Sequence, residues 1–305
     1  MAKKKLSIVL VSFNSWGWVE KCLHSFRNLH GWSEDSQKSP FEVILVDNAS
    51  TDGVVSKVQK QFPWVKTYEL KQNRGFAAGN NQGIQQASAP VVMLLNTDTE
   101  FPPDTDLLSL LQVFDHHSDI AVVTPRVILA DGSLDAASHR GFPTPWNALM
   151  YYSGVANRFP RWRWTAGYHL SWKDLDTAHE IHACSGAAML VRQEAIARVG
   201  LLDEAYFMYA EDIDWCYRFH EAKWRVWYDP SVTVIHHKYK SGIGSMVSWE
   251  TKEKTIRAFY DTMKQYWRKF YTDRYPALVM IFVFAMIELL KYRKLQKERK
   301  HYENT

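Results

Sequence analysis

The sequence has few cysteines and no very long hydrophobic run. Its three cysteines, Cys22, Cys184 and Cys216, lie far apart and form no CxxC pair. This spacing argues against a disulfide framework and a zinc site, and it favours a reducing compartment. The apolar run at residues 277–287 ends at Glu288, short of the ~20 apolar residues that a bilayer span needs. The first apolar run is too short and too β-branched for a signal peptide. We therefore expect a cytoplasmic protein.

Two nucleotide-binding motifs are also absent. No GxxxxGK[ST] loop is present, and no GxGxxG follows the first apolar run, which excludes a P-loop site and the usual dinucleotide fingerprint. The formal net charge of +4 is too small to indicate nucleic acid, so no nucleic-acid partner is expected. The 13 tryptophans are numerous for 305 residues. Tryptophan suits sugar stacking and membrane interfaces as well as a large core.

Short apolar runs recur along the first hundred residues and alternate with segments of helical spacing. The runs cover residues 6–13, 41–46, 64–70 and 90–95. Runs without polar alternation suit strands buried on both faces, and strands separated by helices indicate βαβ units. The pattern predicts an α/β fold with a mostly parallel central sheet flanked by helices. Later segments predict a helix at 104–114 and strands at 120–130, 181–191, 225–228 and 232–236.

Carboxylates stand where several of these segments begin or end. Asp47 and Asp98 follow the second and fourth apolar runs, and Glu211, Asp212 and Asp214 open a predicted helix at 210–221. In open α/β sheets, ligands gather beyond the carboxyl ends of the strands. Mg²⁺ is often held there by one or two carboxylates together with substrate phosphates. Taken alone, each carboxylate also has a simpler explanation, as a helix cap or as a side chain that the helix dipole favours.

Five sequence blocks follow one another along the chain. They are VDNASTDG at 46–53, NRGFAAGNN at 73–81, LLNTD at 94–98, SGAAML at 185–190, and LDE at 202–204 leading to FMYAEDIDWCYR at 207–218. In this order they resemble family 2 glycosyltransferases, and in particular the branch of bacterial rhamnosyltransferases that act on lipid-linked polysaccharide acceptors. The resemblance covers roughly residues 6–245, and its strength lies in the order of the blocks rather than in any one of them.

The resemblance implies a GT-A fold, a nucleotide-diphosphate sugar donor, a divalent metal (Mg²⁺ or Mn²⁺) and inversion at the anomeric carbon. Asp98 matches the last Asp of the metal-binding DxD motif, whereas Asn96 stands where many relatives have Asp. Asp212 matches the catalytic base. His236 resembles a late histidine that contacts metal or diphosphate, although the adjacent His237 leaves the register open.

The same resemblance places the other candidate residues around the donor. Those expected on the nucleotide side are Ser12, Phe13, Asn14, Asp47, Asn73, Arg74 and Gly75. Those expected on the diphosphate or acceptor side are Asn96, Glu211 and Ser241. Simpler explanations remain open for some of them, because Gly75 also suits a tight turn and Glu211 suits a helix start.

Two regions fall outside the blocks. Residues 139–180 form an irregular insert, rich in Pro, Trp and Arg, in the expected domain at 1–245; its Trp146, Trp162, Trp164 and Trp172 suit a core, an acceptor or an interface. Residues 246–305 are expected to form C-terminal helices with an apolar run and a basic flank. Such a tail fits a peripheral position at the inner face of the cell membrane, or a helix docked on the domain.

Three functions remain in competition. The first is a transferase that moves a sugar, most commonly rhamnose from dTDP-rhamnose in this branch, to a lipid-linked saccharide; uridine and guanosine donors stay open. The second is a sugar nucleotidyltransferase, which should carry a basic Gly-rich loop that residues 12–18 lack. The third is an inactive membrane-associated glycan-binding module, against which the presence of Asp98 and Asp212 counts.

Overall fold

The computed structural model describes residues 3–238 and 248–303. These residues divide into two compact units. The first contains the chain up to residue 207 together with residues 212–238, and the second contains residues 208–211 together with the C-terminal helices. The first unit holds the sheet and nearly all candidate site residues.

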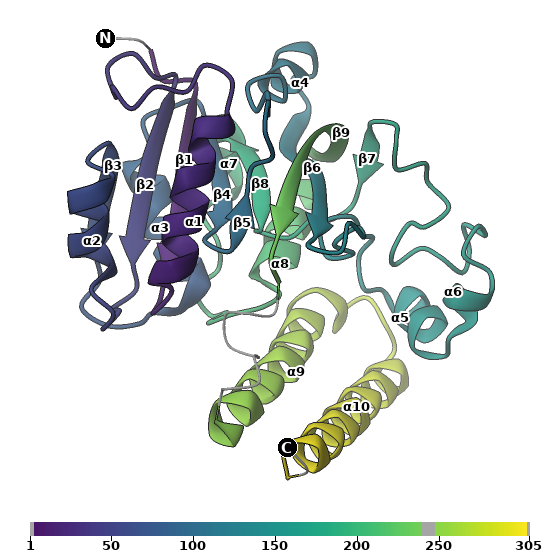
Figure 1. Cartoon of the computed structure of the whole chain (residues 1–305). Coiled ribbons are helices and arrows are strands. Elements are labelled where there is room, and N and C mark those ends of the chain that lie inside the picture. The colour runs from purple at the N-terminus through teal and green to yellow at the C-terminus, as the bar shows by residue number, and fades with distance from the viewer. Residues whose placement is uncertain (1–2, 239–247, 304–305) are drawn as a thin grey trace. The chain divides into compact units, whose positions relative to one another are not determined.

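The first half of the sheet is parallel, as the apolar runs predict. Its four strands lie in the order β3-β2-β1-β4, each paired in parallel with its neighbours. Figure 1 shows α1 in front of these strands and α3 behind them. The elements are β1 (Leu6–Ser12), α1 (Trp16–Ser25), the short 3-10 helix η1 (Phe26–Asn28), β2 (Phe41–Asp47), α2 (Val54–Gln61), β3 (Val65–Glu69), α3 (Gly75–Gln86) and β4 (Val91–Asn96).

The second half of the sheet is mixed. β8 is antiparallel to both β4 and β6, whereas β9 is parallel to β6, and β5 and β7 are antiparallel to β9. The elements are β5 (Thr99–Glu100), α4 (Leu111–His116), β6 (Ile120–Leu129), β7 (His179–Ile181), β8 (Ala188–Arg192), α7 (Gln193–Val199), α8 (Glu211–Glu221) and β9 (Arg225–His236).

The two faces of β1 are covered in different ways. Leu6, Ile8 and Leu10 belong to the main hydrophobic cluster, which also contains the buried side chains of α1 and α2. On the other face α3 lies very close to the strand. A Cβ on Gly79 would stand 2.7 Å from Val11 and one on Gly83 2.3 Å from Val9, so the small residues of α3 permit this approach.

Some expectations for the second half were wrong in detail. The expected helix at 104–114 is reduced to α4, preceded by turns, and the expected strand at 181–191 is two strands, β7 and β8, that pair with different neighbours. The strands expected at 225–228 and 232–236 are one strand, β9, whose pairing with β6 shifts register beside Pro125. Local apolar pattern does not report which strand a segment will pair with.

The insert at 139–180 contains two short helices, α5 (Pro145–Tyr152) and α6 (Val155–Arg158). Its ends are fastened to each other and to the sheet. Arg140 exchanges backbone hydrogen bonds with Ala183, at 3.1 and 2.9 Å. His139 and His179 meet through their Nε2 atoms at 2.7 Å, and burial together with the neighbouring His179 lowers the pKa of His139 to about 4.

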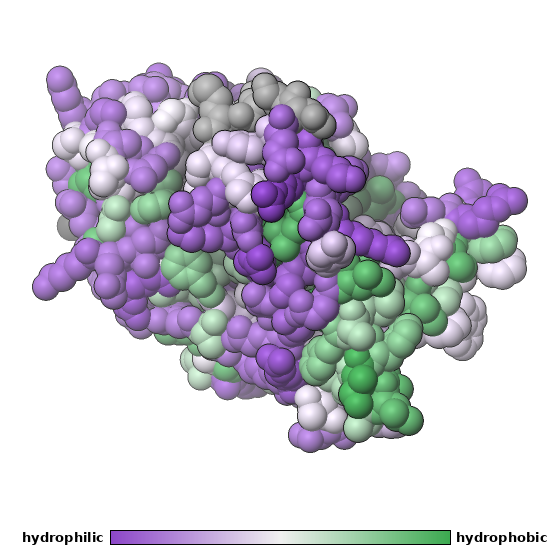
Figure 2. Space-filling model, turned by 90° about the horizontal axis from the view of Figure 1, so that it is seen from below, coloured by the Kyte–Doolittle hydropathy of each residue, from purple (hydrophilic) through white to green (hydrophobic). Residues whose placement is uncertain are grey.

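The second unit is built mainly on two long helices, α9 (Trp249–Tyr271) and α10 (Ala277–Glu303). They are joined by ion pairs that Lys264 makes with Glu288 and that Lys291 makes with Asp261. Within the described ranges, no helix is both long and apolar enough to cross a membrane. The first turns of α10 expose apolar side chains, among them Leu278, Ile281 and Phe282. Figure 2 shows hydrophobic side chains gathered in one area of the lower face.

Candidate active site

The carboxyl ends of the parallel strands lie at one edge of the sheet, as expected. Ser12 at the end of β1 is in register with Asp47 at the end of β2, and Val11 is in register with Asn96 at the end of β4. Asp98 follows in the turn between β4 and β5 and is buried. The prediction that these polar residues lie at one edge of the sheet is therefore confirmed.

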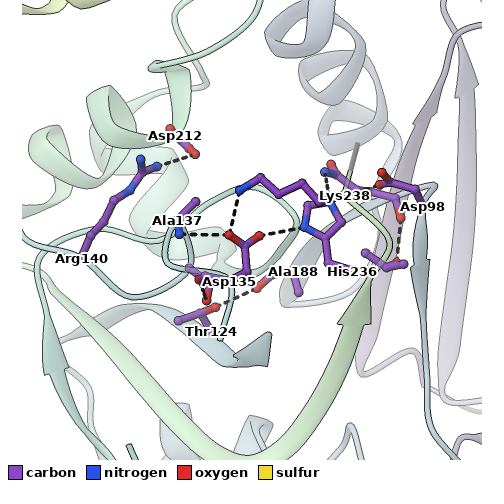
Figure 3. Close-up of polar contacts among 12 residues, drawn as sticks. Asp98, Thr124, Asp135, Ala137, Arg140, Ala188, Asp212, His236 and Lys238 are labelled. Atoms are coloured by element: carbon purple, nitrogen blue, oxygen red, sulfur yellow. Dashed lines mark hydrogen bonds and ion pairs between the residues drawn. The ribbon is translucent and has the colours of Figure 1, made fainter. Parts of the chain in front are cut away.

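His236, at the end of β9, faces Asp98. Its Nε2 lies 3.3 Å from Asp98 Oδ1, and its Nδ1 lies 2.8 Å from Asp135 Oδ2. Figure 3 shows the imidazole between the two carboxylates. Burial disfavours its charged form, but the hydrogen bonds with Asp135 and Asp98 outweigh this and raise the pKa of His236 to about 9.

The arrangement around His236 fits a divalent cation. When Nδ1–H donates to Asp135, the neutral ring directs the Nε2 lone pair at the Asp98 carboxylate, and two electron-rich groups at this distance require a proton or a metal between them. A carboxylate behind a ligating histidine is the usual support of such a ligand. No group of three or more His, Cys, Asp or Glu able to hold a metal occurs in the described part of the chain. A metal here would therefore depend on diphosphate oxygens and water as well.

Asp135 was not identified from the sequence. Its Oδ1 accepts hydrogen bonds from Lys238 Nζ at 2.8 Å and from the Ala137 amide at 3.1 Å. Burial alone would raise its pKa, but His236 and Lys238 outweigh burial and hold the pKa of Asp135 well below the usual range. A permanently ionised Asp135 fixes the orientation of the His236 ring.

The two adjacent histidines have different side-chain partners. The ring of His237 pairs with Glu100 at 3.0 Å, so it is the ring of His236 that faces the Asp98 carboxylate. Asn96 Nδ2 lies 3.4 Å from His236 Nε2, which places the amide beside the same atoms. Ser241 lies outside the described residues.

Asp212 stands at the start of α8 and is held on both oxygens. Oδ1 accepts from the Ile213 amide at 2.7 Å, and Oδ2 accepts from Arg140 at 2.9 Å. Both side chains of the Arg140–Asp212 pair are about 12% exposed. Burial disfavours the charged guanidinium, but Asp212 outweighs burial and raises the pKa of Arg140. Each carboxylate oxygen keeps a further lone pair, with which Asp212 can accept a proton from a hydroxyl group.

On the nucleotide side, Asp47 offers an unused acceptor. Its Oδ2 accepts from the Ser50 amide at 3.0 Å, whereas its Oδ1 is buried and has no hydrogen-bond partner in the described parts of the chain. A buried carboxylate oxygen without a hydrogen-bond donor costs free energy, and a ligand N–H would satisfy it.

The loops after β1 and β2 are tied together beside Asp47. Asn14 accepts from the Thr51 amide at 2.7 Å and so joins the loop after β1 to the loop after β2. Phe13, in the first of these loops, is 50% exposed, as a stacking platform for a base would be.

Other candidates have structural explanations. Gly75 has a φ of +88°, and a Cβ there would lie 2.2 Å from the carbonyl oxygen of Phe207, so close packing requires glycine. Asn73 accepts from the Gly75 amide at 2.9 Å and shapes the same turn. Arg74 pairs with Glu204 at 2.6 Å, so its guanidinium is already engaged with a carboxylate.

Three further polar residues also have structural explanations. Asp214 forms a buried ion pair with Arg218, one turn along α8, at 2.6 Å, which supports the structural reading. Glu211 opens α8, where the helix dipole favours a carboxylate. Ser12 is fully buried, and its hydroxyl lies 3.1 Å from that of Ser15, so it shapes the loop after β1.

Two residues of this site, Asp135 and Arg140, were not predicted from the sequence. Arg140 lies 72 residues before its partner Asp212, and Asp135 lies 101 residues before its partner His236. No spacing rule connects residues at such separations. The only available signals were the hairpin turn at Asp131, which delivers Asp135, and the position of Arg140 at the mouth of the insert.

Solved structures of sugar transferases share this fold. The mannosyltransferase PcManGT from Pyrobaculum calidifontis, solved with GDP-Man and Mn²⁺, aligns with a TM-score of 0.59 at 15% identity and covers 97% of this chain and 73% of its own. GalNAc-T7, solved with UDP, GalNAc and Mn²⁺, aligns with a TM-score of 0.57 at 15% identity and covers 87% and 49%. The fold is therefore GT-A.

The chain belongs to glycosyl transferase family 2, whose model matches residues 7–200. N-acetylglucosaminyl-diphospho-decaprenol L-rhamnosyltransferase of Mycobacterium tuberculosis is 29% identical over 247 residues, which cover 77% of each chain. Low-salt glycan biosynthesis hexosyltransferase Agl10 of Haloferax volcanii is 25% identical over 243 residues, 76% of this chain and 67% of that protein. The protein is thus a glycosyltransferase with a nucleotide-sugar donor, and the family expectation is confirmed. Asp212 and His236 lie beyond the residues matched by the family model.

Proposed function

We propose that this protein transfers a sugar, with rhamnose from dTDP-rhamnose as the first candidate, to a hydroxyl group of a lipid-linked saccharide, with inversion. The observation that carries the proposal is that two residue pairs occur in the same compact unit. One is Asp98 with His236, beyond the parallel strands, and the other is Asp212 with Arg140, at the start of α8. Figure 3 draws both in one close-up. Rhamnose and the lipid-linked acceptor are supported by the printed name of the mycobacterial relative.

Asp212 is proposed as the general base. It accepts the proton of the acceptor hydroxyl while that oxygen forms a bond to the anomeric carbon and the bond to the nucleoside diphosphate breaks. One positioned carboxylate is enough for this single displacement. Arg140 holds the carboxylate in place, since its guanidinium donates to Asp212 Oδ2 at 2.9 Å.

Asp98 and His236 are proposed to hold Mg²⁺ or Mn²⁺, with Asn96 beside them. When bound, the ion supplies positive charge to the departing diphosphate. Asp135 and Lys238 keep the ring of His236 oriented for this purpose. The metal of the Pyrobaculum calidifontis structure, Mn²⁺, supports the same choice here. Asp47, Phe13 and Asn14 are proposed to receive the nucleobase.

The test is a donor panel. The purified protein is incubated with dTDP-rhamnose, UDP-GlcNAc or GDP-mannose, a lipid-linked N-acetylglucosamine acceptor, and Mg²⁺ or Mn²⁺, and nucleoside diphosphate release is followed. We expect acceptor-dependent release with dTDP-rhamnose. Release with another donor alone would replace rhamnose, pyrophosphate release would indicate a nucleotidyltransferase, and no turnover with any donor would contradict the proposal.

We also propose that α10 attaches the protein to the inner membrane surface and that residues 1–245 form the catalytic domain. Leu278, Ile281 and Phe282 are exposed on the apolar half of α10, and the basic half follows them in the chain. An apolar surface beside a basic one suits the interface of an anionic bilayer. Replacing the three apolar residues by Ser should weaken binding to anionic vesicles, whereas unchanged binding would contradict this role.

A further inference from the structure

The insert carries a surface that its own fold leaves uncovered. α5 has the sequence PWNALMYY, yet none of its eight residues is buried, and none of the four residues of α6 is buried either. Figure 1 shows these two helices together, beyond the edge of the sheet at β7. The exposed large side chains, here called the insert surface, are Trp146, Leu149, Tyr152, Phe159, Trp162 and Trp164.

The insert surface is held in a defined shape. The indole N–H of Trp146 donates to the carbonyl of Trp164 at 2.7 Å, and the rings of Phe159 and Trp162 stack with centroids 4.9 Å apart. Trp162 and Trp164 are nevertheless 62% and 82% exposed. Indole rings presented to solvent on a fixed backbone are typical of interaction surfaces.

The charged side chains of the segment that carries these rings are all basic. The sequence contains no acidic residue between Asp135 and Asp174, whereas Arg158, Arg161 and Arg163 are exposed among the aromatic residues. Arg158 lies over the ring of Phe159 at 5.8 Å. A segment that is aromatic and basic and contains no carboxylate side chain is complementary to an anionic, amphiphilic partner. A bilayer interface with anionic headgroups has both properties, since tryptophan favours the headgroup level and arginine favours the lipid charge.

We propose that the insert surface is a second membrane-contact surface, which rests on anionic lipid and presents a membrane-bound acceptor to Asp212. The inference builds on the proposed lipid-linked acceptor. The connection to the site is Arg140, which begins the same insert and holds Asp212 at 2.9 Å. A sugar carried on a lipid can reach the base only close to the bilayer, so an attached insert shortens the path between the two.

The test is vesicle binding by the full chain, without donor or acceptor. Trp162→Ser/Trp164→Ser should raise the apparent Kd for vesicles that contain anionic phosphatidylglycerol by about tenfold, because the affinity for a membrane increases with the apolar area that the protein buries in it. The thermal midpoint should stay unchanged, since both rings are exposed. Arg161→Gln/Arg163→Gln should weaken binding to anionic but not to neutral vesicles. Its matched control is Lys5→Gln/Lys60→Gln, which removes the same charge from exposed lysines elsewhere and should have less effect.

One result would overturn the inference: vesicle binding of Trp162→Ser/Trp164→Ser equal to that of the wild type. If the variant then also had a raised KM for detergent-dispersed acceptor, the surface would be assigned to the acceptor itself. This result does not affect the proposed transfer reaction, because turnover with the detergent-dispersed acceptor is measured separately.

Discussion

Replacing Asp135 by Asn tests the support of the proposed metal ligand. Asp135 accepts from His236, Lys238 and the Ala137 amide, and it is 1% exposed. Asn keeps the size of the side chain but removes the charge that raises the pKa of His236 to about 9. Loss of a group that supports a metal ligand typically costs about 10- to 100-fold in metal affinity, or about 1.4–2.7 kcal/mol.

The pH dependence of the metal affinity gives this prediction a distinct signature. In the metal-free wild type, His236 carries a proton up to about pH 9, and the metal must displace it. Affinity for Mn²⁺ should therefore rise about tenfold between pH 7 and pH 8. In Asp135→Asn the pKa of His236 falls, so the slope flattens. The deficit of the variant should be largest at high pH and should shrink towards pH 7.

The assay is a Mn²⁺ titration in the presence of the nucleoside diphosphate, followed by electron paramagnetic resonance at pH 7.0, 7.5, 8.0 and 8.5. Asp131→Asn is the matched control, because Asp131 is exposed in the hairpin turn only four positions earlier. It should follow the wild type throughout. The reasoning would be refuted if Asp135→Asn kept both the wild-type affinity and the wild-type slope.

Three further predictions concern the base, the loop packing and the donor edge. Arg140→Met should lower kcat by about 10- to 100-fold by misplacing Asp212, and Arg140→Lys should recover part of this; equal rates for all three proteins would contradict a positioning role. Gly75→Ala should reduce the free energy of unfolding by at least about 2 kcal/mol in chemical denaturation, because the new Cβ would meet the Phe207 carbonyl at 2.2 Å; a change near zero would refute the close approach. Phe13→Ala should raise the donor KM at constant kcat and stability, and an unchanged KM would remove Phe13 from the donor site.

The sequence predicted the parts of the site that depend on strand ends. Asp47, Asn96 and Asp98 follow apolar runs, and Ser12 lies near the end of the first run. Parallel pairing brings such positions to one edge of the sheet whatever the details of packing. The same logic did not extend to the second half of the sheet, where β8 runs antiparallel between β4 and β6. Orientation there depends on partners far away in the chain.

The partners of the key residues could not be predicted. Arg140 reaches Asp212, and Asp135 reaches His236, only because the insert and the hairpin after β6 fold back over the sheet edge. Arg74 has a partner of the same kind. The resemblance places it on the nucleotide side of the donor, and its guanidinium pairs with Glu204, 130 residues further along the chain, which no local pattern indicates. A motif fixes where a residue lies in the chain, but tertiary packing decides which group it meets.

The most direct test of the central claim is single-turnover transfer by Asp212→Asn with saturating donor, Mn²⁺ and lipid-linked acceptor. The variant should bind the donor and the metal as the wild type does, because Asp98 and His236 are untouched. Its acceptor-dependent release of nucleoside diphosphate should be about 100-fold slower or worse, while Asp131→Asn stays fully active. Near-normal transfer by Asp212→Asn would contradict the assignment of Asp212 as the base.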